Sequence, residues 1–351
     1  MSTHQSGAGY LRGIGTIVGL ELRQRVRSVA WYVLLGVFAA LLLAVTGLAF
    51  AVSSSWDSTG DTVYSIVVFF VLLLATLVSP ALSGNAINGD RDAATLAPVQ
   101  VTLATTGQII LGKLLAAWVT GLAFLAVAVP FLLVATLAGG VEPGVVAVSL
   151  LVLVFEVGVV AAVGVGLSGV LARPLFSVAV TYLVVAALSI GTLIAFGLGG
   201  AAVRSEVVET SRYLSYGDDS TYDCEEWQTS TYDSPRYDRV WGFLAANPYV
   251  ILADATPTTF DGNGYPVDLF GQIKLGIRYA QQTPELERVY DECEQSEEEL
   301  YPTGEEIIAS TTPSWFVGMG IHLVLAAGAL WWAWWRTRTP AGRLARGTRI
   351  A

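Results

Sequence analysis

Residues 107–113 have the types and spacing of a site that could bind a nucleotide phosphate. They read GQIILGK, which fits the first seven positions of a phosphate-binding loop. The next residue, Leu114, replaces the Ser or Thr that would hold a magnesium ion, and no buried strand precedes the run. We therefore expect this chain to bind neither ATP nor magnesium, so that any ATP hydrolysis belongs to a partner chain.

Two ionisable side chains, Glu156 and His322, lie inside long apolar runs. An ionisable group at the centre of a membrane costs at least about 2.5–3.5 kcal/mol unless it faces a cavity or a partner. Glu156 could mark a transport path or a subunit interface, or it could be a hydrogen-bonded carboxyl that staples two helices; the sequence leaves both open. His322 has no carboxylate nearby in the sequence, which favours helix packing over a proton relay. Neither residue belongs to a recognisable set of catalytic residues, and we expect no catalytic site in this chain.

The only two cysteines, Cys224 and Cys293, both fall within the acidic segment 201–313. On the outer side of a membrane an isolated pair indicates a disulfide. Closing a loop of this size would stabilise the segment by about 4 kcal/mol in the chain-entropy model. Two cysteines without a nearby histidine do not predict a metal site. A second motif, Gly164, Gly166 and Gly169, spells a dinucleotide fingerprint, but its place in an apolar run predicts close helix packing instead.

The composition is that of a membrane protein. Of the 351 residues, 54% are hydrophobic and 14% are charged, whereas a soluble domain carries about a quarter charged residues. Six apolar runs are long enough to cross a bilayer. They cover residues 31–52, 63–82, 114–138, 145–171, 176–200 and 315–335. The first run lacks a cleavage signature, so we expect no removable signal.

Charge sets the expected topology. The N-terminus holds four Lys and Arg residues, the loop 83–113 two, the turn 172–175 one and the tail 336–351 five, whereas the loops 53–62 and 139–145 hold none. The positive-inside rule then places both termini and the loop 83–113 in the cytoplasm of a plasma-membrane protein. Segment 201–313, with 22 acidic and 7 basic residues, is expected outside. Long domains cross largely regardless of their charge.

The residue pattern within 1–30 predicts an amphipathic helix on the membrane surface. Apolar residues recur every three or four positions from Tyr10, and basic residues cover the other face. We expect Arg23, Arg25 and Arg27 to face anionic headgroups, at about 1 kcal/mol each. Glu21 and Arg25 are spaced for an intrahelical ion pair.

Segment 201–313 is long enough for a small domain. Its pattern predicts a helix at 203–214 that continues the fifth span, loops over 216–235, an amphipathic helix at 267–279 and a helix-prone acidic run at 285–306.

The loop between the second and third spans, residues 83–113, organises the chain. It reads SGNAINGDRDAATLAPVQVTLATTGQIILGK, and residues 99–111 suit a short helix on the membrane surface or against a partner. The loop resembles that of permeases of type-2 ATP-binding-cassette (ABC) exporters. The resemblance rests on a charged start, a Thr-Leu pair, the approach to the third span and a Gly-Lys ending, matched here by Asp90, Arg91, Asp92, Thr95, Leu96, Gln108, Gly112 and Lys113.

The resemblance implies a fold and partners. The fold would be an all-α membrane protein with an interfacial helix in 1–30, five spans in 31–200, an extracytoplasmic domain at 201–313, a sixth span at 314–335 and a basic cytoplasmic tail at 336–351. The partners would be a separate ABC ATPase subunit, which touches the loop 83–113 and the N-terminal helix, and a second permease copy or a paralogue. The lipid bilayer surrounds them, and no nucleic acid is involved.

Two other functions fit a six-span chain. A membrane-anchored sensor would use segment 201–313 for recognition, but it leaves the long polar loop unexplained. An ion-coupled secondary transporter would use Glu156, work without ATP and lose activity in Glu156→Gln. The absence of a second intramembrane acid disfavours it.

Overall fold

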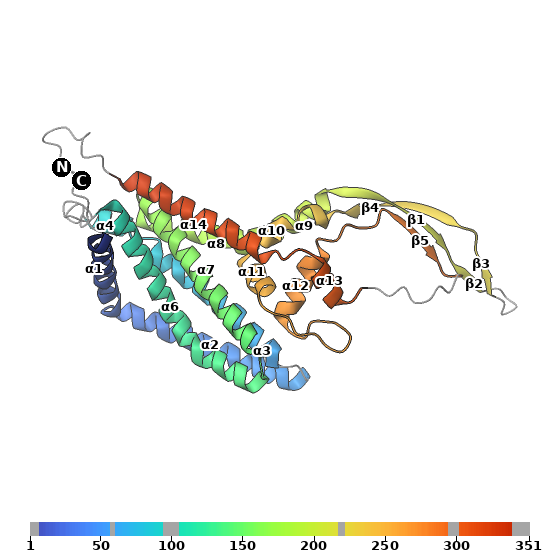
Figure 1. Cartoon of the computed structure of the whole chain (residues 1–351), viewed down its shortest axis with the longest axis horizontal. Coiled ribbons are helices and arrows are strands. Elements are labelled where there is room, and N and C mark those ends of the chain that lie inside the picture. Colours follow the sequence, from blue (N-terminus) through green and yellow to red (C-terminus); the bar gives the residue numbers. More distant parts are fainter. Residues whose placement is uncertain (1–6, 57–59, 94–104, 217–221, 294–301, 339–351) are drawn as a thin grey trace.

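The computed structural model describes residues 7–56, 60–93, 105–216, 222–293 and 302–338. Within these residues, six helical segments are long and apolar enough to cross a membrane, as the sequence predicts. They are α2 (Val29–Trp56), α3 (Gly60–Ser83), α6 (Thr106–Gly139), α7 (Pro143–Val170), the composite segment Pro174–Ala202 and α14 (Trp315–Thr337). The six segments form one bundle, with smaller elements at both of its ends (Figure 1).

Helices α7 and α14 approach each other closely through glycines. A Cβ atom at Gly166 would lie 2.6 Å from the Cβ of Ala329, and one at Gly169 would lie 2.6 Å from the Cβ of Ala333. Gly164 faces Ser83 of α3 in the same way. The helix-packing interpretation of these glycines is therefore confirmed, and the close approach positions the two ionisable residues of α7 and α14.

The fifth span changes its winding at its centre. It consists of α8 (Pro174–Ala186), a π-helical turn η1 (Ala187–Gly191) and α9 (Thr192–Ala202). A π-turn disturbs the helical hydrogen-bond ladder, and backbone groups in an apolar environment need other partners. The Asn247 amide supplies one, because its Nδ2 donates to Ser189 O at 2.6 Å and to Thr192 Oγ1 at 2.9 Å.

One end of the bundle carries α1 (Gly7–Val26) and α4 (Asn88–Asp92), and α1 runs across this end (Figure 1). The prediction of a surface helix over residues 99–111 is wrong for its last part, because α6 begins at Thr106 and residues 106–113 belong to the spanning helix. Residues 94–104 lie outside the described residues. Helix α6 begins at Thr106 because of a capping box: the Thr105 hydroxyl accepts from Gln108 N, and the Gln108 side chain accepts from Thr105 N.

The opposite end carries the insert 201–313, which contains strands that the all-helical expectation omitted. The described strands are β1 (Arg204–Arg212), β2 (Leu214–Tyr216), β3 (Tyr222–Cys224), β4 (Gln228–Pro235) and β5 (Glu287–Asp291). One sheet has the order β4-β1-β5, with β4 antiparallel and β5 parallel to β1, and β2 pairs with β3. The predicted helix at 203–214 is wrong, as are the predicted loops where β4 lies.

Short helices lie between the sheet and the bundle (Figure 1). They are the 3-10 turn η2 (Tyr237–Arg239), α10 (Gly242–Ala245), α11 (Pro248–Ala255), α12 (Leu269–Tyr279) and α13 (Gly304–Ser310). The amphipathic helix predicted at 267–279 is confirmed as α12, whose Phe270 ring packs on Phe69 of α3 with centroids 5.0 Å apart. The helix-prone run 285–306 instead supplies β5 and the start of α13, and its residues 294–301 lie outside the described part. Cys224 and Cys293 form the predicted disulfide.

Candidate functional site

The side chain of Lys113 joins three elements at the α1 end of the bundle. Its Nζ lies 2.5 Å from Glu21 Oε1 of α1 and 2.6 Å from Asp90 Oδ2 of α4. The Lys113 side chain, on α6, is only 5% exposed, against 20% for Glu21 and 36% for Asp90. A buried ammonium requires such partners, because desolvating an unpaired charge costs several kcal/mol. We call these three residues the Lys113 triad; it ties α1 and α4 to a spanning helix.

Helix α1 also contacts the first turns of α6 directly. The Gln108 side chain, which caps α6, donates from Nε2 to Tyr10 O of α1 at 3.0 Å. Gly112 allows the two helices to approach, since a Cβ atom there would lie 2.7 Å from Ile17 Cγ2. The predicted site residues Gln108, Gly112 and Lys113 therefore hold α1 in place; they do not end a loop.

Asn88 anchors α4 on its other side. The backbone N–H groups of Ile87 and Asn88 donate to Ser168 Oγ of α7 at 2.8 and 3.1 Å. The Asn88 Nδ2 donates to Ser177 Oγ of α8 at 2.7 Å, and Asn88, Ser168 and Ser177 are all fully buried. Sequence reasoning missed these three residues, because a lone Ser or Asn beside a span carries no distinctive pattern. They fix α4 to two further spans.

Two charged residues of α4, Arg91 and Asp92, lie outside the Lys113 triad. Arg91 is half-buried and Asp92 is exposed, and neither forms an ion pair with another described residue. Asp90, in contrast, is part of the Lys113 triad. The other two predicted loop residues, Thr95 and Leu96, lie outside the described residues. A short, rigidly held helix thus presents an acid and a base at the end of the bundle.

The basic residues of α1 divide into two groups. Arg23 and Arg27 are exposed, as expected for side chains that face headgroups. Arg25 is half-buried, and its Nη2 donates to Leu82 O of α3 at 2.9 Å, which the headgroup expectation did not include. Burial lowers the pKa of the Arg25 guanidinium below its ordinary value, an effect that the Glu21 carboxylate partly offsets. The predicted Glu21–Arg25 ion pair is replaced by Glu21–Lys113.

Glu156 and His322 meet inside the bundle. The His322 Nδ1 lies 3.1 and 3.0 Å from the two Glu156 carboxyl oxygens, and His322 Nε2 lies 2.9 Å from Ala246 O. Both side chains are 1% exposed. The pair links α7 and α14 to the end of α10 in the insert. Of the two interpretations that the sequence left open for Glu156, this geometry favours the helix-stapling carboxyl.

Asp254 of α11 connects the insert to the start of α14. Its Oδ1 accepts from Arg278 Nε at 3.0 Å and from Arg278 Nη2 at 2.7 Å. Its Oδ2 accepts from Ser314 N, Ser314 Oγ and Trp315 N at 2.5, 2.9 and 3.0 Å. The carboxylate therefore satisfies the first N–H groups of α14 in place of a local cap. We call Asp254, Arg278 and Ser314 the α14 clamp.

None of these clusters has the geometry of a phosphate-binding loop. Residues 107–113 are helical, and the Lys113 ammonium contacts two carboxylates of its own chain. No protein-family model matches the chain, and no curated protein matches it. The features of the chain that bear on function are therefore the Lys113 triad, Asn88 and the two remaining charged residues of α4, Arg91 and Asp92.

The Lys113 triad can be tested by removing its cation. We expect Lys113→Met to lower the free energy of unfolding by about 1–2 kcal/mol, because it removes the ammonium that two carboxylates share; their partial exposure keeps the loss below the cost for a fully buried pair. Titration with sodium dodecyl sulfate measures this change in the free energy of unfolding. Arg23→Met, which removes an exposed cation from α1, is the control and should change stability by less than about 0.5 kcal/mol. Equal effects of the two variants would contradict the triad.

Proposed function

We propose that the chain is the transmembrane permease subunit of an ATP-driven exporter of the type-2 ABC class. The observation that carries the proposal is the rigid mounting of α4 beside α1. Lys113 and Asn88 attach α4 to three spanning helices, while Arg91 and Asp92 remain available to a partner. An element that must pass force from a soluble subunit to membrane helices needs both properties, because a loosely held loop would absorb the motion.

The proposed topology places both termini, α1 and α4 in the cytoplasm and the insert outside the plasma membrane. Six spans put the two ends of the chain on the same side, and the Lys and Arg distribution selects the cytoplasm. The disulfide in the insert supports an oxidising, extracytoplasmic location, because the cytosol keeps most thiols reduced. The acidic insert and the basic ends then lie on opposite sides of the bilayer.

In this proposal two permease subunits, identical or paralogous, form the pathway, and a pair of separate ATPase subunits docks on α1 and α4. Binding of ATP closes the ATPase pair and moves α4. The Lys113 triad transmits this motion to α6, and Asn88 transmits it to α7 and α8 through Ser168 and Ser177. The chain itself binds no nucleotide; its contribution is the mechanical connection and the spans.

Co-purification tests the proposal. The tagged chain is extracted from its native membrane in mild detergent, and the eluate is analysed by mass spectrometry and by an ATPase assay. We expect an ATPase subunit to co-elute with the intact chain and to fall at least tenfold in the double variant Arg91→Ala, Asp92→Ala. Arg91 is half-buried and Asp92 is exposed, and neither forms an ion pair with another described residue, so we expect the double variant to fold.

The matched control is Glu142→Ala, which removes a charge at the turn between α6 and α7, at the other end of the bundle. It should leave co-elution unchanged. If the intact chain brings down no ATPase, or if both variants reduce co-elution equally, the proposed docking surface is wrong.

A further inference from the structure

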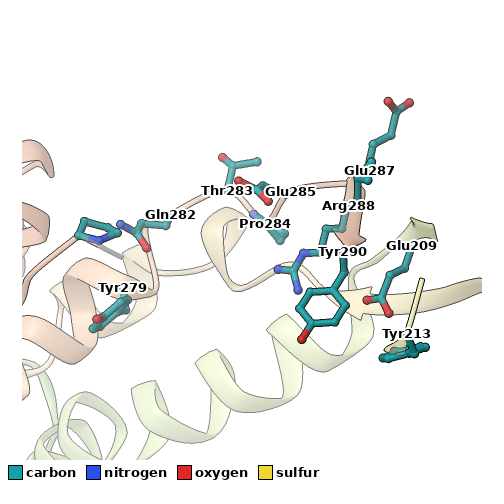
Figure 2. A pocket seen from close by; sticks show the side chains of 12 residues that line it. Glu209, Tyr213, Tyr279, Gln282, Thr283, Pro284, Glu285, Glu287, Arg288 and Tyr290 are labelled. Carbon is teal, nitrogen blue, oxygen red and sulfur yellow. The ribbon is translucent and has the colours of Figure 1, made fainter. Parts of the chain in front are cut away.

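A cleft of about 1120 Å³ opens in the insert between β5 and the segment that follows α12 (Figure 2). Four successive residues, 287–290, line it from β5, so the cleft follows the edge of the strand as well as one of its faces. In the described part of the chain, β5 pairs with β1 alone, which leaves its other backbone edge without a strand partner. A free edge of this kind can accept hydrogen bonds from an added strand.

The side chains around the cleft combine aromatic rings with carboxylates. Tyr213 and Tyr290 pack with ring centroids 5.8 Å apart, and Figure 2 shows Glu209 beside them, with Tyr279 on the far side. Glu285 lines the wall between the two groups. Cations bind favourably over aromatic faces, and a field of one sign concentrates ligands of the other. The whole insert, with 22 acidic and 7 basic residues, adds to that field.

Arg288 makes the ligand requirement more specific. Its guanidinium extends from β5 toward the opposite wall (Figure 2), and it forms no ion pair with another described residue. A simple organic cation would gain nothing from this group. A peptide would, because its backbone carbonyls accept hydrogen bonds from a guanidinium while its basic side chains reach Glu209 and Glu285.

Both walls of the cleft are held in place before any ligand binds. On one side, the Gln281 side chain donates to Thr312 O at 2.9 Å and accepts from Thr312 N at 3.0 Å. On the other side, β5 lies in the sheet, and the disulfide of Cys293 follows it directly. A preformed site avoids part of the entropy cost of ordering a loop on binding.

We propose that this cleft binds an extended cationic peptide, whose backbone adds to the free edge of β5 and whose Lys or Arg side chains contact the tyrosine rings and carboxylates. The cleft is at least as large as a typical small-molecule pocket of about 300–1,000 Å³, and an elongated ligand fits its course along a strand. Binding does not require the proposed ATPase partner, so the purified chain suffices for the experiment.

Fluorescence anisotropy of the full chain in lipid nanodiscs tests the proposal with fluorescein-labelled octapeptides. An alternating Lys-Val peptide should bind at least tenfold more tightly than an alternating Glu-Val peptide. A Lys-Val peptide with alternate backbone nitrogens methylated on its pairing edge should lose at least tenfold in affinity, because it cannot donate to β5. This comparison leaves the protein unaltered.

Two sets of protein variants locate the site. Tyr290→Ala and Glu209→Gln should each weaken binding of the Lys-Val peptide at least fivefold. The control Glu225→Gln, Glu226→Gln removes two exposed charges of the insert that do not line the cleft, and it should change affinity less than twofold. Equal weakening by the control, or undiminished binding of the methylated peptide, would overturn the proposal and indicate general attraction to an acidic surface.

Discussion

Asp254→Ala is expected to lower the free energy of unfolding by about 3–5 kcal/mol, the loss that follows when one partner of a buried ion pair is removed. The Asp254 side chain is 0% exposed and that of Arg278 is 3% exposed. Alanine would leave the guanidinium without its carboxylate and would also leave the first N–H groups of α14 without an acceptor. Few single changes remove a charge partner and a helix cap together.

Sodium dodecyl sulfate titration of the purified chain measures this loss, and hydrogen exchange localises it. Faster exchange should appear at the start of α14, where Ser314 and Trp315 lose their acceptor. The double variant Asp254→Leu, Arg278→Met should recover much of the stability, since an apolar pair of similar volume can replace a buried ion pair. Recovery would show that the unpaired guanidinium causes the loss.

Asp291→Ala is the matched control for this experiment. It also removes a carboxylate from an Arg–Asp pair of the insert, but Arg212 there is 28% exposed and Asp291 is 12% exposed. Water can solvate the arginine that remains, so we expect a loss of about 1 kcal/mol. Losses of equal size in the two alanine variants would contradict the assignment of Asp254 to a buried structural clamp.

The spans were predictable because hydrophobicity acts locally. A run of about twenty apolar residues has no other stable environment than a bilayer, so the six segments follow from composition and length. The start of α6 was also readable, since Thr105 and Gln108 have the spacing of a capping box, but the polar residues within 99–111 favoured a short helix on the membrane surface or against a partner over an early start of the third span.

The insert was harder to predict because its strands depend on distant partners. Residues 203–214 contain enough helix-forming residues to suggest a continued span, yet Val207, Val208 and Thr210 suit a strand once β4 and β5 are available. Strand β5 comes from a segment that is locally helix-prone and pairs with residues about eighty positions earlier. Tertiary pairing overrides local propensity in both places.

In the candidate site, too, local sequence indicates some features, whereas others depend on residues that are distant in the chain. Residue types identified Lys113, Asp90 and Glu21 as charged residues of the loop and of the N-terminal helix, but their meeting depends on α1 folding back across α6. The Glu156–His322 pair spans 166 positions and could not be found by searching for a carboxylate near His322 in the sequence. Sequence identified the chemical groups, and only the fold identified their partners.

The hydrogen-bond geometry of that pair restricts its protons. A carbonyl oxygen only accepts, so the contact to Ala246 O requires a proton on His322 Nε2. The Nδ1 contact then needs one more proton, shared between the imidazole and the Glu156 carboxyl. The pair therefore carries no net charge whichever group holds this proton, which is how two ionisable groups can occupy the interior of a bundle without an unpaired charge.

This proton count predicts losses of different size for two substitutions of Glu156. Glu156→Gln can donate from its amide to Nδ1, so stability should fall by less than about 1 kcal/mol, whereas Glu156→Leu leaves a buried ring nitrogen without a partner and should cost about 2–3 kcal/mol. Sodium dodecyl sulfate titration compares the two. The double variant Glu156→Leu, His322→Leu should be closer to the intact protein than Glu156→Leu alone.

Proton flux separates this stapling role from ion-coupled transport. If Glu156 carried protons across the membrane, proteoliposomes with the purified chain would show proton uptake down a pH gradient, and Glu156→Gln would abolish it because an amide does not titrate. We expect the intact chain and the Gln variant to give the same flux as empty liposomes. Flux that depends on Glu156 would contradict the stapling role. A carboxyl that releases its proton during transport cannot remain in the closed, 1% exposed pair with His322 that joins α7, α14 and the insert.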